Sequence, residues 1–369
     1  MQRDDPDRYR DRLMIERIAS RLGFDWLAAR LPGDVYPPYV LVAVALVVQF
    51  GVVDGYNFFV TGRSTVLDNP TSVITGLGLI LAVAGSRWMR DSYAEAVADL
   101  RPSERDGTVG ETGDAGKPLP EAFRSIVPVR VTLAFLVIGY LAFFGNAVVL
   151  LGIDTLVEIR GVVGTILRDF IVLPAVVVPA MIEFGVLYLG IHVGLPRKIA
   201  AADLDLFYYD PRDMGGFAAV GQLLKRSYYL LTVGLLLYFF LVYGPVILSG
   251  ILPTPFPEPE APILVMFTVL WFAGVASIAY SMYRIHTVMA RKKAATIREI
   301  EDEIREILDD PYDINTAHIA DHDRREAIEH RLQQVRATKE YPSTFTMWSQ
   351  ILISVLLPQA LQLAVQVAP

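Results

Sequence analysis

Long apolar runs alternate with polar segments along the whole chain. Seven of these runs are 18 to 27 residues long, at 39–60, 72–89, 127–153, 170–194, 227–252, 262–284 and 345–367. A helix rises 1.5 Å per residue, so about 20 apolar residues are enough to cross the ~30 Å hydrocarbon core of a bilayer. The pattern predicts an all-α, polytopic membrane bundle with seven transmembrane helices.

The polar segments divide the chain into parts of different character. Residues 1–38 are predicted to be cytoplasmic, with an amphipathic helix at 8–31 lying on the membrane surface. Residues 39–285 hold spans 1 to 6, and the linker 101–120, rich in Gly, Pro and charge, is predicted to be disordered. A cytoplasmic helical hairpin at 286–340 and the final transmembrane helix at 341–369 complete the chain.

The sixth apolar run has no stop signal where its apolar residues end. We expect this helix to continue as a charged helix to Asp310, where the sequence DDPYD ends it. A second charged helix, 316–340, then returns. Both charged helices repeat apolar residues at intervals of three, four or seven. Such a stripe must be buried against the neighbouring helix or against another subunit.

The basic residues predict the direction of the spans. Of the 33 Lys and Arg residues, 29 lie before span 1 and after spans 2, 4 and 6, and 3 lie in the segments on the opposite side. Positive charge marks the cytoplasmic side, so the N-terminus is predicted inside and the C-terminus outside. This orientation excludes a rhodopsin or a G-protein-coupled receptor, and no lysine lies inside a span to form a retinal Schiff base.

Composition excludes further classes. Hydrophobic residues make up 53% of the chain, and there is no cysteine, so disulfides, thiolate catalysis and Cys-based zinc sites are excluded. No enzyme motif is present, no cofactor is predicted, and a net charge of −7 gives no nucleic-acid footprint. Aspartate outnumbers glutamate by 24 to 16, and only six basic residues are lysine, a composition that indicates either the high-salt cytoplasm of halophilic archaea or an acidic mesophile.

The final apolar run differs from the others because it contains neutral polar residues. A helix that faces only lipid has no use for several glutamines. Three of them share one face, and Pro358 can kink the helix enough to align the rest. The stripe indicates either a pore lining or hydrogen bonds between helices. The pore-lining candidates are Gln350, Ser354, Gln359, Gln362 and Gln366.

Glu183 is predicted near the middle of the fourth span. The semi-apolar stretch 154–169 before this span is expected to form a short surface or re-entrant helix. A carboxylate at mid-bilayer costs about 2.5 kcal/mol or more, so such a residue is a functional candidate. It can coordinate a cation, relay a proton, or remain protonated and bond to a neighbouring helix. Pro174 and Pro179 on the same helix free backbone carbonyls nearby.

Two weaker candidate sites lie outside the centre of the spans. Asp54 and Asn57, in the outer third of span 1, are candidates for an outer vestibule or simply mark the interface. His318 and His322 are spaced by four residues on the returning charged helix, a spacing that suits zinc. Their charged neighbours favour an ordinary solvated face, so no metal site is predicted.

The layout resembles the insect odorant and gustatory receptor superfamily of seven-helix ion channels. The features that match are the inside N-terminus, the seven spans, the helices extended into the cytoplasm and a last helix divided by a break at 341–344. In this resemblance 316–340 corresponds to the cytoplasmic half of the last helix and 345–367 to its membrane half. It implies four subunits joined through the cytoplasmic helices and a central cation pore lined by the final span.

The sequence therefore predicts a multi-pass protein of the cell membrane and favours an oligomeric, ligand-gated ion channel over two alternatives. One alternative is a secondary transporter that uses Glu183 at the bilayer midplane. The other is a membrane sensor or scaffold that signals through residues 286–340. The expected partners are the lipid bilayer, other copies of the chain, and a small-molecule ligand or ion.

Overall fold

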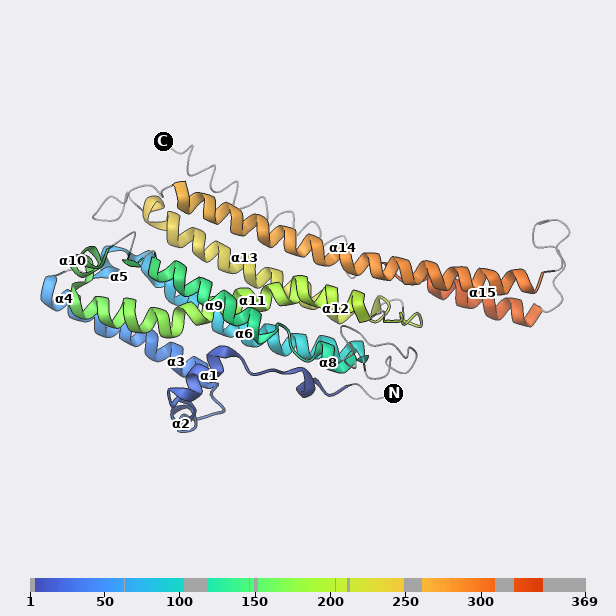
Figure 1. The fold of residues 1–369 in the computed structure, drawn as a ribbon, viewed down its shortest axis with the longest axis horizontal. Helices are drawn as coiled ribbons and strands as arrows, with labels where there is room; N and C mark the ends of the chain where they lie inside the picture. Colours follow the sequence, from blue (N-terminus) through green and yellow to red (C-terminus); the bar gives the residue numbers. More distant parts are fainter. Residues whose placement is uncertain are drawn as a thin grey trace.

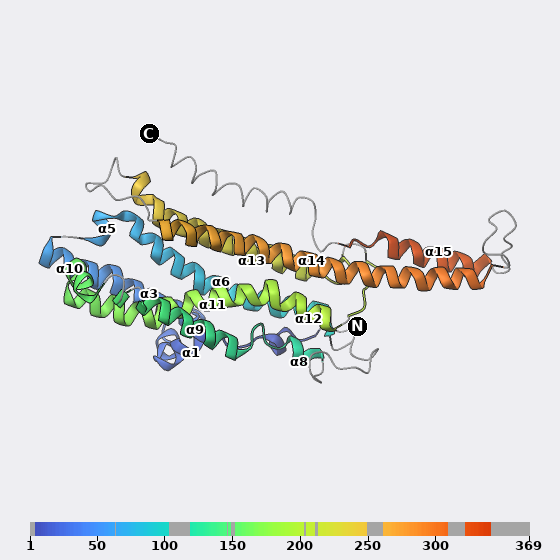
Figure 2. The ribbon, with the colours of Figure 1, turned by 45° about the horizontal axis from the view of Figure 1, so that its top comes forward.

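The predicted all-α class is confirmed. The structure is a computed structural model that describes residues 4–62, 64–102, 119–145, 147–148, 152–202, 204–210, 213–248, 261–308 and 322–340. These residues are mainly helical and contain no strand, only one isolated antiparallel bridge between Phe207 and Gly215. Long helices run side by side through most of the molecule (Figures 1 and 2).

Several helices in the described residues are suited to a membrane. Five are long and apolar enough to cross one, and they contain the predicted spans 1, 2, 4, 5 and 6 wholly or in large part: Pro37–Val60, Pro70–Leu100, Gly161–Ala202, Ala218–Ile247 and Val265–Glu306. A shorter apolar helix, Val129–Phe144, lies within the predicted third span. The chain is therefore a multi-pass membrane protein. The predicted seventh span lies outside the described residues, so the count of seven and the inside N-terminus stay predictions.

The helical elements have the following bounds. The N-terminal part contains η1 (Pro6–Tyr9), α1 (Met14–Arg21) and α2 (Phe24–Ala28). The first two spans contain α3 (Pro37–Leu46), η2 (Val47–Val53), α4 (Asp54–Thr61), α5 (Thr65–Asp68), η3 (Pro70–Ser72) and α6 (Val73–Leu100). The middle contains α8 (Leu119–Phe123), α9 (Val129–Phe144), α10 (Ile153–Gly164), η5 (Thr165–Val177), α11 (Val178–Leu189), η6 (Gly190–Gly194) and α12 (Leu195–Ala202). The last described elements are α13 (Ala218–Ile247), α14 (Ala261–Glu306) and α15 (His322–Ala337).

Helix α6 lies at the centre of the bundle and packs against α13, α11 and α3. Glycine allows one of these close approaches, because a Cβ atom at Gly85 would lie only 2.8 Å from the ring of Phe184 on α11. Helix α9 packs on the other side of α11, where a Cβ atom at Gly139 would lie 2.8 Å from Ile182. No residue of α9 itself is buried. Helix α9 is thus a peripheral helix held on the bundle by one small face.

The fourth span begins earlier than the sequence indicates. Gly161 has a left-handed φ of 69° and turns the chain between the start of α10 and the long helix that follows. That helix then passes through the π-helical element η5, which includes Pro174 and packs beside another π-helical element, η2. Proline removes a backbone donor, and local π-helical turns in a membrane helix allow the freed backbone groups to find other partners. Much of the predicted surface stretch 154–169 is therefore continuous with the span.

The N-terminal segment differs from the predicted surface helix. Residues 8–31 form no single helix, because Gly23, with φ 81°, separates α1 from α2. The apolar side chains of Tyr9, Leu13 and Ile15 are buried in the main core together with residues of α6 and α11. The amphipathic face of α1 is covered by the protein's own bundle, while Trp26 on α2 remains exposed. In Figure 1 this segment lies against the lower side of the bundle.

Helices α14 and α15 pack side by side within the stretch 286–340. Helix α14 continues without a break from the apolar region to Glu306, and α15 packs along its far half, well beyond the other helices (Figure 1). Contacts of Arg331 with Glu303 and of Lys293 with the carbonyl of Thr338 make the pair antiparallel. The apolar stripe is buried between the two helices, in a cluster formed by Ile300, Ile328, Leu332 and Val335. The stripe is therefore covered within one chain.

Candidate functional site

The start of helix α1 has backbone donors that its own sequence only partly satisfies. The first N–H groups of any helix have no partner inside it, and a Ser, Thr, Asp or Asn at the N-cap normally accepts one. Here the N-cap residue is Leu13, which has no side-chain acceptor. The carboxylate of Glu16, three residues on, accepts the N–H of Leu13 at 2.8 Å. The N–H groups of Met14 and Ile15 need an acceptor from elsewhere.

Glu183 on α11 supplies that acceptor. Its two carboxylate oxygens accept the N–H groups of Met14 and Ile15, the second at 3.0 Å. The residue is 5% exposed. A carboxylate at a helix N-terminus is favoured by the helix dipole as well as by the hydrogen bonds. The predicted intramembrane charge is thus the cap of a helix that lies 168 residues earlier in the chain.

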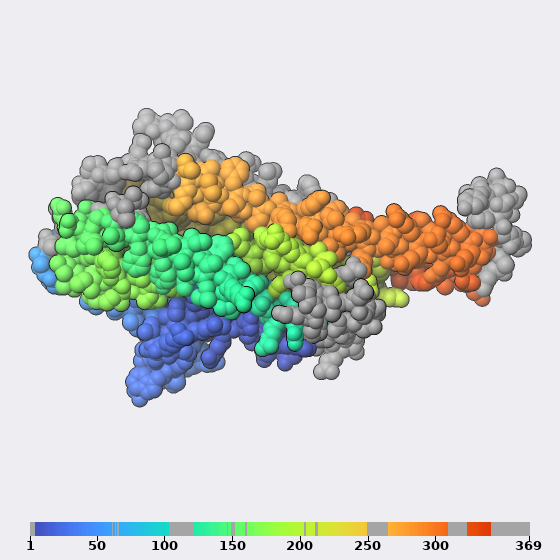
Figure 3. Space-filling model, in the orientation of Figure 1, coloured from blue at the N-terminus to red at the C-terminus, as the bar shows by residue number. Residues whose placement is uncertain are grey.

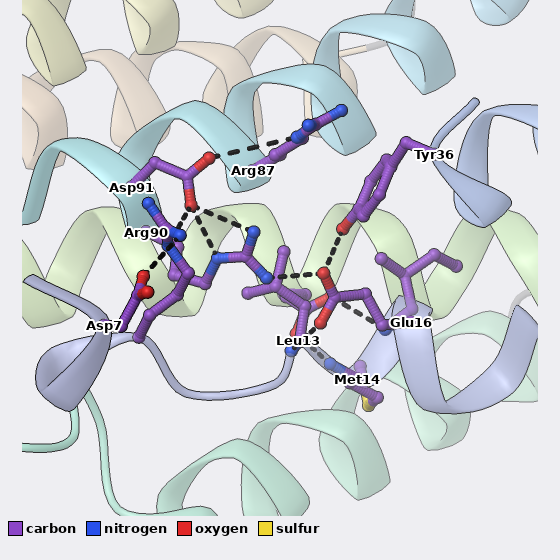
Figure 4. Close-up of polar contacts among 11 residues, drawn as sticks. Asp7, Leu13, Met14, Glu16, Tyr36, Arg87, Arg90 and Asp91 are labelled. Atoms are coloured by element: carbon purple, nitrogen blue, oxygen red, sulfur yellow. Dashed lines mark hydrogen bonds and ion pairs between the residues drawn. The ribbon is translucent and has the colours of Figure 1, made fainter. Parts of the chain in front are cut away.

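A buried ion pair lies next to this cap. The guanidinium of Arg90 on α6 binds Glu16 Oε1 and also Asp91, with Nε and Nη2 at 3.0 and 2.9 Å from Asp91 Oδ1. The side chains of Arg90 and Glu16 are only 9% and 16% exposed. The hydroxyl of Tyr36 donates to the same Glu16 oxygen at 2.7 Å. Figure 4 shows these groups converging from α1, α6 and the residue before α3.

Tyr36, just before the first span, is held as a hydrogen-bond donor. Burial and the neighbouring carboxylate of Glu16 raise the pKa of its phenol above the ordinary value, so the hydroxyl keeps its proton. The guanidinium of Arg87 lies 4.3 Å from the centre of the Tyr36 ring, a cation–π contact. The phenol therefore fixes one oxygen of Glu16 while the ring faces a second cation.

We call the group Glu16, Tyr36, Arg90 and Glu183 the N-terminal clasp. Its members come from α1, the start of α3, α6 and α11, so it joins the N-terminal segment to three membrane helices. An outer ion pair extends it, because Arg10 lies 3.1 Å from Asp91 and 2.7 Å from Asp7. Every carboxylate in the clasp has a cationic or N–H partner. The arrangement is suited to holding the N-terminal segment on the bundle.

Sequence reasoning found Glu183 but missed its partners. Glu16 and Arg90 were visible only as members of charged stretches. The Glu at the third position of α1 was half of a capping-box signal, which Leu13 concealed by replacing the usual Ser or Thr. Arg90 could have been noticed as an arginine where the apolar part of α6 ends.

The other predicted site residues have different outcomes. Asp54 and Asn57 are 7% and 6% exposed, and Asp54 accepts a hydrogen bond from Ser64 at 2.7 Å, so both are buried at the end of the first span rather than facing an open vestibule. His322 begins α15, and the described residues contain no group of three or more metal-ligating side chains. The candidates Gln350, Ser354, Gln359, Gln362, Gln366 and His318 lie outside the described residues.

Arg168 is a further intramembrane charge. The sequence placed it in the stretch before the fourth span, but it lies on η5 inside the long apolar helix. It borders a small pocket of about 30 Å³ between η2, α6 and η5, together with Gln49 and Thr75. The space is large enough to hold water. These polar groups lie among the helices and away from the clasp.

Two pockets border the clasp. One, of about 310 Å³, lies beside Glu16, Tyr36 and Arg90 on the side of α2 and the start of α3. The other, of about 120 Å³, lies beside Glu183 and Arg90 on the side of α9.

Comparison with protein-family models, curated proteins and solved structures finds no match for the chain.

Proposed function

We propose that the chain is a subunit of an oligomeric ion channel in which the pore lies between subunits and is lined by the final span, 345–367. The main support is the packing of the bundle interior. The main core extends from Leu13 through Val83 to Val172 and is continuous and apolar. Ions crossing through one subunit would have to pass this core, where buried polar side chains such as Arg90 and Glu183 are already bound to other groups of the chain. A path between subunits avoids that cost.

The position of α14 agrees with this proposal. One face of its apolar half packs on α13 through Phe267 and Trp271. Val265, Val269 and Phe272 are exposed at intervals of four and three residues, so they form one stripe away from α13. The same helix continues into the hairpin with α15. A helix of this kind offers a surface to the final span or to a second copy and links it rigidly to the polar hairpin.

The experiment is cysteine scanning of the final span in reconstituted bilayers. The chain has no cysteine, so each introduced thiol is the only one. Cysteines at Gln359, Gln362 and Gln366 should react with a charged thiol reagent and change the conductance. Matched cysteines at Leu357, Ala364 and Val365 should not. Equal inaccessibility of both sets, or a purified oligomer without conductance, would remove the channel proposal.

The alternative of a transporter that uses Glu183 must account for the N-terminal clasp. Both oxygens of this carboxylate are occupied by the N–H groups of Met14 and Ile15. The carboxylate becomes available to an ion only when the N-terminal segment leaves the bundle. A transporter of this type therefore requires release of the segment in each cycle, which cross-linking of the segment to α11 would block.

A sensor or scaffold is the second candidate function, and the hairpin favours it. The apolar stripe of α14 and α15 is satisfied within the chain, so the hairpin projects as a charged, self-contained unit. Such a unit needs no second subunit for its own folding. Removal of residues 290–338 distinguishes the two functions: a channel assembled through this hairpin becomes monomeric, whereas a scaffold keeps its assembly state and loses only signalling.

A further inference from the structure

The pocket of about 120 Å³ beside Glu183 has one polar side and one apolar side. It lies between the segment before α1, the start of α9 and α11. The polar side is formed by Asp11, Arg12, Arg17, Arg90 and Glu183. The apolar side is formed by Val129 and Leu133 of α9, Val186 and Leu187 of α11, and the preceding Ile126 and Val127.

The arginines that line this pocket are not equivalent. Arg90 is bound to Glu16 and Asp91, and Glu183 is occupied by backbone N–H groups. The guanidinium groups of Arg12 and Arg17 are exposed and have no hydrogen bond or ion pair with any described residue. The lining therefore carries three arginines, two of them free, against the two carboxylates of Asp11 and Glu183. The free charge of the pocket is positive.

The apolar side continues out of the pocket along α9. Val129, Leu133, Val137 and Leu141 are spaced by four residues and are 52% to 70% exposed, so they form one stripe along the helix. We call this stripe the α9 track. In Figure 3 α9 lies at the surface, directly above the N-terminal segment. An apolar track of this length on a membrane helix faces hydrocarbon, and its polar end meets the two free arginines.

We propose that this pocket binds the headgroup of an anionic phospholipid from the adjoining leaflet, with its phosphate on Arg12 and Arg17 and an acyl chain along the α9 track. Guanidinium groups bind phosphate through paired N–H bonds. Basic pockets at the polar ends of membrane helices select anionic headgroups. Inorganic phosphate would use only the arginines and leave the track unoccupied, so the structure favours the lipid.

Lipid bound here would also touch the clasp. The pocket is bordered by Met14, whose N–H is bonded to Glu183, and by Arg90. An occupied pocket neutralises the two free arginines and fills the space between the N-terminal segment and α9. Bound lipid should therefore strengthen the docking of the segment on the bundle.

The test uses the full-length protein purified in a neutral detergent. Thermal unfolding and native mass spectrometry are recorded with phosphatidylglycerol, phosphatidylcholine or inorganic phosphate added. The double variant Arg12→Gln/Arg17→Gln removes the free arginines. Arg21→Gln/Arg124→Gln is the matched control, because it removes the same charge from exposed arginines that do not line the pocket. Leu133→Trp fills the apolar side and leaves both arginines in place.

We expect phosphatidylglycerol to raise the unfolding temperature of the wild type and of the matched control. It should also remain bound to both proteins in the mass spectra. Its apparent affinity should fall roughly 25-fold in the Arg12/Arg17 variant, given about fivefold per arginine near an anionic headgroup. It should also fall in Leu133→Trp. The proposal is overturned if phosphatidylcholine acts equally, if inorganic phosphate gives the same stabilisation, or if the Arg12/Arg17 variant responds like the matched control.

Discussion

The carboxylate of Glu183 on α11 accepts the backbone N–H of Ile15 on α1 at 3.0 Å. This bond joins a transmembrane helix to the N-terminal segment across 168 residues of sequence. It replaces the N-cap that Leu13 does not provide. A carboxylate such as that of Glu183 is costly in lipid or in an apolar core. Here it accepts hydrogen bonds from two backbone N–H groups of α1 that have no acceptor within their own helix.

Replacing Glu183 with Gln should release the N-terminal segment. Glutamine retains one acceptor oxygen but presents an N–H₂ group to the second backbone donor, so one N–H of α1 loses its partner. We expect a loss of about 1–3 kcal/mol in the docking of the segment. Limited proteolysis and amide exchange of residues 10–21 should both become faster.

The matched control is Glu158→Gln, an exposed carboxylate on α10. It should leave both rates unchanged. Equal protection of the segment in Glu183→Gln and the wild type would show that Glu183 does not act as the cap.

The Glu16–Arg90 pair should show strong coupling in a double-mutant cycle. Removing one member of a buried pair leaves its partner buried without compensation, at a cost of about 3–5 kcal/mol, so Glu16→Gln and Arg90→Gln should each lower the unfolding midpoint markedly. The double variant should cost less than the two single variants together. Midpoints are measured by thermal unfolding in detergent.

An exposed pair in the hairpin provides the comparison for this cycle. Arg331 and Glu303 are in contact, with side chains 46% and 39% exposed. Exposed pairs contribute about 0–1 kcal/mol. At this exposed pair the losses of stability in the two single variants should simply add. The same strict additivity at Glu16 and Arg90 would contradict a buried ion pair in the clasp.

The hairpin core should depend on Leu332. This side chain is buried between α14 and α15, and truncating a buried Leu to Ala costs about 2–5 kcal/mol. Leu332→Ala should therefore increase amide exchange in α15 while the membrane helices keep their protection. Gln333→Ala, at the exposed neighbouring position, should have no such effect. Loss of protection throughout the bundle would show that the hairpin is not an independent unit.

The orientation predicted from the basic residues can be tested with two reporters. Because 29 of 33 basic residues mark one side, a tag after Pro369 should be accessible only from outside. A tag inserted near residue 110 should be accessible only from inside. A tag at Pro369 that reacts only from the cytoplasm would exclude both the seven-span topology and the channel proposal.

The membrane helices were largely predictable because their signal is local. Twenty consecutive apolar residues have no other stable environment than lipid or a packed bundle, so the apolar runs of α3, α6, α11, α13 and α14 identify them without tertiary information. The continuation of α14 into a charged helix was equally visible, because nothing in the sequence between Arg284 and Glu306 ends it. The apolar stripe that includes Ile300 and Leu332 predicted burial. It did not decide whether the stripe packs on the neighbouring helix or on another subunit.

The candidate site depends on contacts that no local pattern contains. The run of arginines and apolar residues before Pro37 suits a helix on lipid as well as a helix on protein, since both bury the same face. Only the tertiary structure places the open N-terminus of α1 beside Glu183 and pairs Glu16 with Arg90. The sequence by itself determined that the chain enters a membrane and which residues are costly there. The tertiary structure decided which groups bind these residues. Hydrogen bonds and ion pairs form only between groups that packing brings to within about 3 Å of each other, and those groups lie far apart in the sequence.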